Sequence, residues 1–149
     1  VRLAQFAALV HQSAHLFSKI LETNNIRELE HLFDAHPSDY WLTRFQFDKG
    51  SVQRTKNPGR NFVHLLIINT IAPYLFHYGK TNKQEAFQNH ALGLLEALPP
   101  EANAMMDGWA ELGMQARNAY QTQALIQLKT KYCDQRRCLE CAMGNAILK

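Results

Sequence analysis

The chain has 149 residues, of which 46% are apolar and 19% charged, and its formal net charge is +3 at pH 7. A chain of this length is the size of one ordinary domain and buries roughly 70% of its unfolded surface on folding. The balance of apolar and charged residues argues against a disordered segment. A net charge this small gives only a weak overall field, so any affinity for nucleic acid would depend on local basic patches.

The sequence contains no predicted membrane span and no predicted signal peptide. Its longest mainly apolar run, residues 62–78, is interrupted by His64, Asn69, Pro73 and His77 and is shorter than the ~20 residues that cross a bilayer. The first residues, VRLAQFAALVHQ, predict an amphipathic helix with no cleavage site after it. We therefore expect a cytoplasmic protein. Because the chain lacks an initiating Met and starts within a helical pattern, we also expect a C-terminal fragment of a longer protein.

In the first 46 positions the apolar residues recur at helical spacing. Residues 3–21 carry a broad apolar stripe, which predicts one long helix buried on more than one side. Asn25 followed by Glu28 resembles a capping box, and it predicts a short second helix that ends before Pro37. Ser38 is placed to cap a further turn that carries three aromatic residues.

The middle of the chain combines a polar loop with the apolar run. Residues 47–60 contain glycine, proline and many polar side chains without a helical period, which predicts the longest loop of the chain. Residues 61–78 predict a central buried helix with Gly79 at its C-cap. Because Pro73 lacks a backbone donor, we expect a kink or a division into two helices there.

Helical patterns continue to the end of the chain. Thr81 and Gln84 predict a capping box for a helix that ends before Pro99, and three more helices follow, one of them from about residue 118 to residue 132. No segment alternates as a strand would. We therefore predict an all-α fold, a single compact bundle of about six to eight helices in one domain over residues 1–149. A long basic loop and a Cys-rich C-terminal hairpin complete the predicted architecture.

The three cysteines of the chain lie within nine positions, in the spacing Cys-x4-Cys-x2-Cys. Thiolates at such a spacing favour zinc or an iron–sulfur cluster, which makes Cys133, Cys138 and Cys141 candidate metal ligands. Structural zinc requires four ligands, and the sequence does not assign the fourth. The alternative is three reduced cysteines, with Cys133 and Cys141 buried and Cys138 partly exposed. Both interpretations stay open.

Basic side chains gather in two polar segments. The first is residues 44–60, where Asp48 is the only acidic residue, and the second flanks the cysteines. Basic loops beside backbone donors are suited to contact with phosphates, although a solvated surface is the default for such runs. The candidate nucleic-acid-binding residues are Lys49, Arg54, Lys56, Arg60, Arg136 and Arg137.

Catalytic machinery is not visible in the sequence. His11 and His15 are four residues apart on a predicted helix, but no carboxylate accompanies them as a metalloprotease motif requires. The sequence also has no Gly-rich phosphate loop and no nucleophile elbow. No catalytic residue is therefore assigned, and whether the full-length protein is an enzyme stays open.

Four phrases spread over the chain, RLAQFAALVHQSAHLFSKILE, INTIAPYLFHYG, QALIQLKTKYC and CLECAMGNAILK, together resemble the C-terminal half of the bacterial DUF2851 family, whose function is unknown. The resemblance implies a missing N-terminal region with a restriction-endonuclease-like fold. This chain would then be a helical accessory module of a nuclease-like protein, with DNA or RNA and that N-terminal domain as partners. No membrane contact is expected, because the sequence predicts no membrane span. The terminal pattern YC….RCLECAMG is also similar to the end of helical DNA glycosylases, where a helix runs into an iron–sulfur loop. Those enzymes have four cysteines with a wider first spacing, and the fourth is missing here.

Two other functions remain open from the sequence. One is a structural or protein-interaction domain with no catalytic or nucleic-acid role, whose helix faces pack against the absent N-terminal half. The other is a thiol-based redox or metal-sensing role. Arg136 and Arg137 would favour the thiolate form of a neighbouring cysteine, which suits metal binding and redox chemistry equally.

Overall fold

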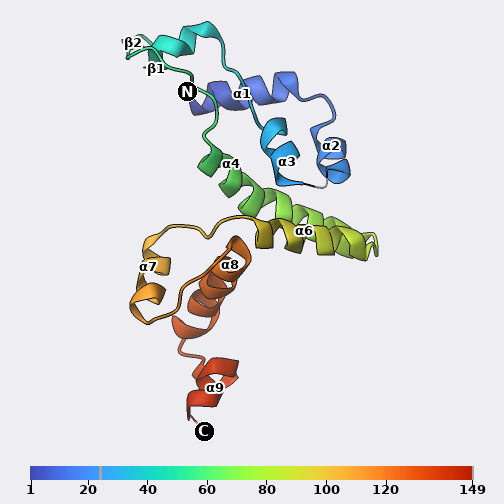
Figure 1. The fold of residues 1–149 in the computed structure, drawn as a ribbon, viewed down its shortest axis with the longest axis vertical. Helices are drawn as coiled ribbons and strands as arrows, with labels where there is room; N and C mark the ends of the chain where they lie inside the picture. The colour runs from blue at the N-terminus through green and yellow to red at the C-terminus, as the bar shows by residue number, and fades with distance from the viewer. Residues whose placement is uncertain (24, 149) are drawn as a thin grey trace. The chain divides into compact units, whose positions relative to one another are not determined.

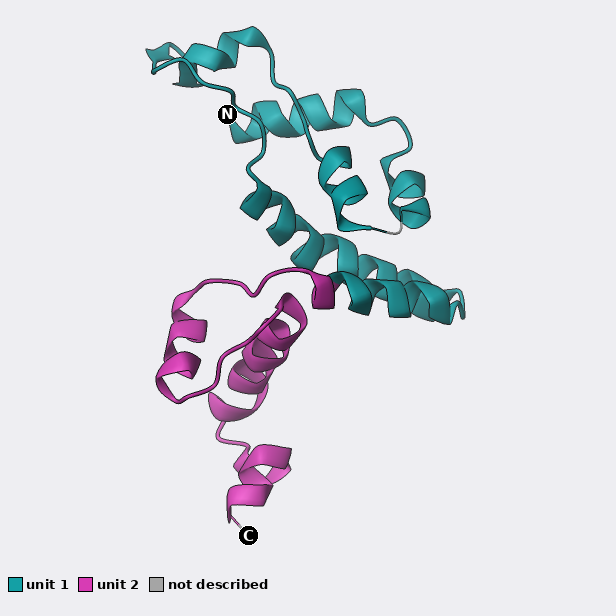
Figure 2. Ribbon diagram, viewed as in Figure 1, with its two compact units in different colours: residues 1–94 teal, residues 95–149 magenta. Residues whose placement is uncertain are grey.

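The structure is a computed structural model that describes residues 1–23 and 25–148 (Figure 1). It is mainly α-helical, so the predicted all-α class is confirmed. The chain divides into two compact units, Val1–Leu94 and Leu95–Lys149 (Figure 2). The prediction that residues 1–149 form one domain stays a prediction.

Unit 1 begins with two helices where the sequence predicted one. Helix α1 (Arg2–Gln12) ends before Ser13, and α2 (Leu16–Glu22) begins after His15, whose φ of 59° is left-handed and interrupts the helix. The predicted burial is also wrong for α1, because Leu3 is 84% exposed and Phe6 is 63% exposed. The apolar stripe of α1 is therefore an open surface of unit 1.

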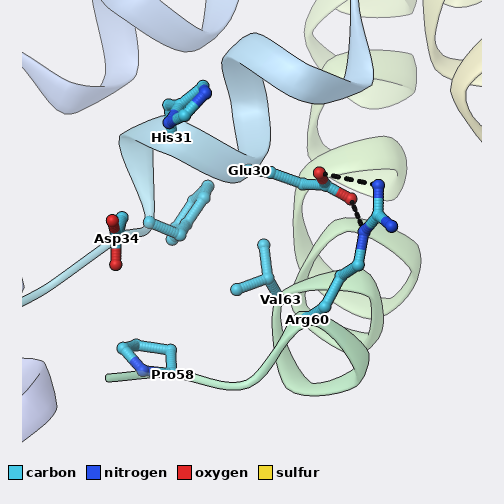
Figure 3. Close-up of a pocket in the computed structure, with 7 residues that line it drawn as sticks. Glu30, His31, Asp34, Pro58, Arg60 and Val63 are labelled. Atoms are coloured by element: carbon cyan, nitrogen blue, oxygen red, sulfur yellow. Dashed lines mark hydrogen bonds and ion pairs between the residues drawn. The ribbon is translucent and has the colours of Figure 1, made fainter. Parts of the chain in front are cut away.

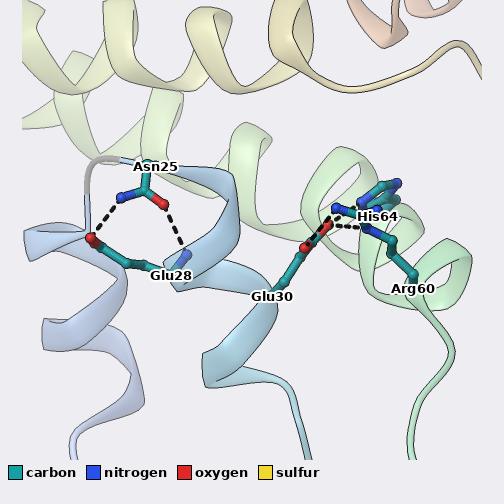
Figure 4. Close-up of polar contacts among 5 residues, drawn as sticks. All are labelled: Asn25, Glu28, Glu30, Arg60 and His64. Carbon is teal, nitrogen blue, oxygen red and sulfur yellow. Dashed lines mark hydrogen bonds and ion pairs between the residues drawn. The ribbon is translucent and has the colours of Figure 1, made fainter.

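Helix α3 (Ile26–Leu32) starts at the predicted capping box, which is confirmed (Figure 4). The backbone N–H of Glu28 donates to Asn25 Oδ1 at 2.9 Å, and Asn25 Nδ2 donates to Glu28 Oε1 at 2.6 Å. The first bond satisfies a helix-end donor that would otherwise need water, and the second joins the two side chains to each other. Leu29 is fully buried, and Phe33 follows α3 into the core.

A short antiparallel hairpin follows, which the sequence did not predict. A 3-10 helix, η1 (Asp39–Thr43), leads into β1 (Arg44–Gln46), which pairs with β2 (Lys49–Gly50). Asp48 makes the reversal with a φ of 59°. The prediction of no strand is wrong here because strands of three and two residues are too short to show an alternating pattern.

The apolar run forms one helical course from residue 60 to residue 81, composed of α4 (Arg60–Leu66), the π-helical turn η2 (Ile67–Ile71) and α5 (Ala72–Thr81). The π turn ends just before Pro73, where an α-helix would crowd a carbonyl, so the predicted disturbance is present as a π turn. Ile67, Ile71 and Leu75 are buried along this course and with Leu29 belong to the core of unit 1.

Helix α6 (Glu85–Ala97) packs closely against the end of α5, and the boundary between the two units falls within α6. The predicted capping box is wrong, because Thr81 is the last residue of α5. Gly79 is not a C-cap either, because α5 continues past it. A Cβ at Gly79 would lie 2.7 Å from Gln84 O and 3.0 Å from Phe87 Cβ. Only glycine therefore permits this approach of the two helices.

We expect Gly79→Ala to destabilise the protein by about 1–3 kcal/mol, because the added methyl group meets backbone that cannot move without repacking α5 and α6. The matched control is Gly93→Ala in α6, where a Cβ would meet no atom within 4 Å. That substitution should stabilise by about 0.5–1 kcal/mol through helix propensity. Urea denaturation measures both changes, and equal effects of the two substitutions would contradict the close packing at Gly79.

Unit 2 comprises the end of α6 together with α7 (Ala104–Glu111), α8 (Ala119–Leu128), the π turn η3 (Lys129–Cys133), the 3-10 helix η4 (Cys138–Glu140) and α9 (Ala142–Leu148). Asn103 caps α7, and Asn118 caps α8 with a side chain that accepts from Gln121 N at 3.0 Å. Thr122 Oγ1 is buried and accepts from Glu101 N at 3.3 Å, which ties α8 to the preceding loop.

Over the ranges that the structure describes, no helix combines the length and the apolar character needed to span a membrane.

Candidate nucleic-acid interface

The hairpin of unit 1 carries several of the predicted basic residues on a backbone that is fixed at both ends. Thr43 O accepts from Ser51 N at 2.6 Å, and Leu42 O accepts from Arg54 N at 3.0 Å. The nitrogen of Val1 donates to Phe45 O at 3.1 Å. These bonds hold β1 and residues 51–54 to η1, and β1 to the start of α1, so the side chains project from a defined surface.

Aromatic side chains lie together at the closed end of this hairpin. The ring centroids of Tyr40 and Trp41 are 5.2 Å apart, and those of Trp41 and Phe47 are also 5.2 Å apart. The Tyr40 hydroxyl accepts a hydrogen bond from Asp48 N at 3.3 Å, which fixes the turn against the ring. Phe47 is nevertheless 74% exposed. Because its ring adjoins those of Tyr40 and Trp41, the exposed Phe47 belongs to an aromatic cluster and is not an isolated surface ring.

Basic side chains lie directly over the rings of this region. Arg44 Cζ is 4.4 Å from the centroid of Tyr40, and Arg54 Cζ is 4.5 Å from the centroid of Phe45. A guanidinium over a ring face is attracted by the ring quadrupole and retains donors for other contacts. We call the set Tyr40, Trp41, Arg44, Phe45, Phe47, Lys49 and Arg54 the aromatic–basic hairpin.

Lys56 differs from the other predicted basic residues because its side chain is buried, with the residue only 5% exposed. Its Nζ lies 4.0 Å from the centroid of Phe45 and has no hydrogen-bond partner among the described residues. Burial lowers the pKa of Lys56, and the charge of Arg54 lowers it further. Gln5 Nε2 donates to Lys56 O at 2.6 Å and anchors this part of the chain to α1. Contact between Lys56 and a phosphate would require the side chain to move.

Arg60 forms an ion pair at the start of α4 (Figures 3 and 4). Its Nε and Nη2 donate to the two carboxylate oxygens of Glu30 at 2.8 and 3.2 Å, and His64 Nε2 lies 2.6 Å from Glu30 Oε1. The hydrogen bond from Arg60 is the main cause that lowers the pKa of Glu30, against the opposing effect of burial, and Glu30 in turn raises the pKa of Arg60. The pair joins α3 to α4, so a phosphate at Arg60 would compete with Glu30.

A shallow cavity of about 250 Å³ adjoins this ion pair (Figure 3). Glu30, Asp34 and Arg60 lie on its wall together with apolar groups of Phe33 and Val63. Beside it, Asn57 Nδ2 donates to Asp34 Oδ1 at 3.1 Å, which holds the loop before α4 against the end of α3. The acidic groups are already used in these contacts, so the cavity is best explained as a junction between α3 and α4.

The Glu30 contacts predict a specific loss of stability in acid. Because the pKa of Glu30 is lowered in the folded protein, its contacts stabilise the fold above the ordinary value of 4.5, and this contribution is lost as the pH falls through the lowered value. We expect Glu30→Gln to lower the Tm by a few degrees near neutral pH, on the order of 2–6 °C. The difference in Tm from the parent protein should shrink below about pH 4.5.

The control for this measurement is Glu22→Gln, an exposed carboxylate on α2 that has no ion-pair partner within the described part of the chain. Its Tm should match that of the parent at every pH. If the Tm of Glu30→Gln differs from that of the parent by the same amount from acid to neutral pH, the lost contacts do not depend on the carboxylate charge.

The second basic group lies in unit 2, around the cysteines. Arg137 Nε donates to Glu140 Oε2 at 3.2 Å, and this pairing raises the pKa of Arg137 and lowers the pKa of Glu140. Lys129 forms an ion pair with Asp134. Arg136 is exposed and has no hydrogen bond or ion pair from its side chain among the described residues. Of the two predicted arginines, Arg136 is therefore the more available.

The structure places the three cysteines in different surroundings. Cys141 is buried, whereas Cys133 and Cys138 are exposed. Gly144 of α9 lies so close to the backbone of Cys138 that a Cβ there would clash with the Cys138 carbonyl, which fixes η4 against α9. In residues 1–23 and 25–148, no group of three or more His, Cys, Asp or Glu side chains is arranged to hold a metal. Metal binding by Cys133, Cys138 and Cys141 stays a prediction.

This difference in exposure predicts the reactivity of the thiols. We expect Cys133 and Cys138 to react rapidly with a thiol reagent in the native protein, and Cys141 to react only after denaturation, because reagent access follows burial. Mass spectrometry of labelled peptides measures each site. A metal held by the three thiols would instead protect all of them until a chelator is added, and uniform rapid labelling would contradict the burial of Cys141.

Sequence reasoning named Lys49 and Arg54 of the hairpin as candidate contacts but missed its rings. Tyr40 and Trp41 were assigned only to a capped turn, and Phe47 only to a loop. The available signal was the interleaving of aromatic and basic residues between positions 40 and 54. That pattern is typical of surfaces that bind single-stranded nucleic acid.

The fold and this surface define a mainly helical module with an exposed aromatic and basic hairpin. The model of the family "Protein of unknown function (DUF2851)" matches residues 1–104, and the chain belongs to this family. The match covers all of unit 1, including the aromatic–basic hairpin, and ends before the cysteines. Comparison with curated proteins and with solved structures gave no match.

Proposed function

We propose that this chain is a helical accessory module that contacts nucleic acid through the aromatic–basic hairpin of unit 1. The observation that supports the proposal is the arrangement of cations there. Lys49 and Arg54 are exposed, and neither side chain has an ion-pair partner in the part of the chain that the structure describes. Arg54 instead lies over the ring of Phe45, with its guanidinium donors free for another acceptor.

The local charge supports an anionic partner. Residues 39–56 contain four basic and two acidic side chains, although the whole chain is only weakly basic. Arg54 and the buried Lys56 both lie over the same ring, so their mutual repulsion is relieved by an anion near the hairpin. Phosphate groups supply such charge along the whole length of a nucleic acid.

The six predicted contacts do not contribute equally to this proposal. Lys49, Arg54 and Arg136 are exposed and have no ion-pair partner among the described residues. Arg60 and Arg137 are also exposed but are held by Glu30 and Glu140, and Lys56 is buried. We place the main phosphate contacts at Lys49 and Arg54. The proposed wider context is a larger protein whose N-terminal region resembles a restriction endonuclease, in which this module would hold the substrate.

Salt dependence of binding tests the proposal. With fluorescein-labelled oligonucleotides, single-stranded and duplex, the full chain should bind at least one probe with an affinity that falls steeply as salt rises. The double variant Lys49→Ala, Arg54→Ala should weaken binding and reduce the slope of log K against log salt by about 0.7–0.9 for each lost phosphate contact.

Lys80→Ala is the matched control, because it removes an exposed charge of the same sign from α5, outside the hairpin. It should leave both the affinity and the salt slope close to those of the parent. Absence of salt-dependent binding to either probe would overturn the proposed function.

A structural or protein-interaction role is the second candidate function. The observation that favours it is the open apolar face of α1, where Leu3, Phe6 and Val10 are exposed and share one side of the helix. Exposed apolar groups at such spacing are typical of a helix that packs against another protein surface. This role becomes the better explanation if the chain binds neither probe.

A further inference from the structure

We infer that the aromatic–basic hairpin selects single-stranded nucleic acid, with an unpaired base stacked on Phe47. The inference rests on the proposed function and specifies the substrate class of the same surface. It starts from the exposure of Phe47, whose ring is the most open of the hairpin's aromatic groups and lies at the turn between β1 and β2. With 74% of the residue exposed, Phe47 is largely open to solvent at the tip of a supported hairpin.

The neighbouring rings hold Phe47 in place. The Trp41 and Phe47 rings meet at 64° with centroids 5.2 Å apart, and the Tyr40 centroid is 6.3 Å from that of Phe47. The Tyr40 ring is itself fixed by Arg44 over its face and by the hydrogen bond from Asp48 N. Stacking on a ring that is already ordered costs little side-chain entropy, so this cluster is a preorganised platform.

Charge next to the platform matches the backbone of a single strand. Lys49 follows Phe47 across the turn, and its backbone pairs with Gln46 in the register of the hairpin. Arg54 lies on the adjacent segment, held by its bond to Leu42 O. A single strand can place a base on Phe47 while its phosphates contact these two cations, which is the combination that proteins use for unpaired strands.

A duplex cannot use the same platform without distortion. Its bases are stacked on each other and present only edges in the grooves, so contact with Phe47 would require a base to be unstacked at an energetic cost. Lys49 and Arg54 could still contact duplex phosphates. The aromatic cluster therefore adds affinity for the unpaired strand alone.

The experiment compares Phe47 variants of the full chain on three labelled probes: an oligothymidylate of about 16 nucleotides, the corresponding oligouridylate and a duplex of equal length. The parent should bind the single strands more tightly than the duplex. Phe47→Ala should weaken single-strand binding by about ten-fold or more and leave duplex binding unchanged. Phe47→Trp should restore single-strand binding, and its added fluorescence should be quenched by the single strands but not by the duplex.

The other possible results separate a failure of the stacking inference from a failure of the proposed function. The stacking inference is overturned if the Lys49→Ala, Arg54→Ala variant loses affinity for the single strands but Phe47→Ala does not. It is also overturned if the parent binds duplex and single strands equally. In both cases the proposed phosphate contacts of Lys49 and Arg54 still stand. If the parent binds no probe in a salt-dependent way, the proposed function itself fails. Circular dichroism of Phe47→Ala should match the parent, because Phe47 is exposed and contributes little to the core.

Discussion

Burial of the apolar face that runs through α4, the π turn and α5 is the constraint on which unit 1 depends. Val63, Ile67, Ile71 and Leu75 are all buried along this course, and Leu29 of α3 is buried with them. Each side chain of this kind contributes about 1.5–3 kcal/mol when fully removed from water. Once this face is covered, the start of α4 is fixed, and the loop that precedes it has a defined end. The hairpin is attached to that loop.

Polar contacts then fix the positions of the segments around this apolar face, namely α3, the loop before α4 and α1. Glu30 joins α3 to α4 through Arg60 and His64, and Asn57 joins the intervening loop to Asp34. Gln5 carries the connection on to α1 by accepting from Arg2 and donating to Lys56 O. Through these bonds the basic segment, which the sequence suggested as a free loop, becomes a supported surface.

The predictable parts of the fold are those determined by residues close to each other in the sequence. The cap at Asn25 and Glu28, the central apolar helix and the disturbance before Pro73 all follow from residues within a few positions of each other. The break at His15, the close approach at Gly79 and the exposure of Leu3 and Phe6 depend on tertiary packing, which helical periodicity does not contain. The same limit applies to the candidate site. Lys56 and Arg54 look alike in sequence, but one is buried against Phe45 and the other is exposed, and Arg60 is matched to an acid thirty positions earlier.

The placement of Lys56 links folding to ligand binding. The ammonium group of Lys56 has no hydrogen-bond acceptor among the described residues and lies close to a second cation, which opposes the folded arrangement of its segment, whereas its position over the Phe45 ring favours that arrangement. In the proposed complex, an anion at the hairpin would offset part of that repulsion only when the segment is folded, so by thermodynamic linkage the ligand would raise the stability of the segment. Local opening of residues 44–56 should therefore be more frequent in the free chain than in the bound one. If the proposed contact with nucleic acid is made, the order of this surface would depend on its occupant.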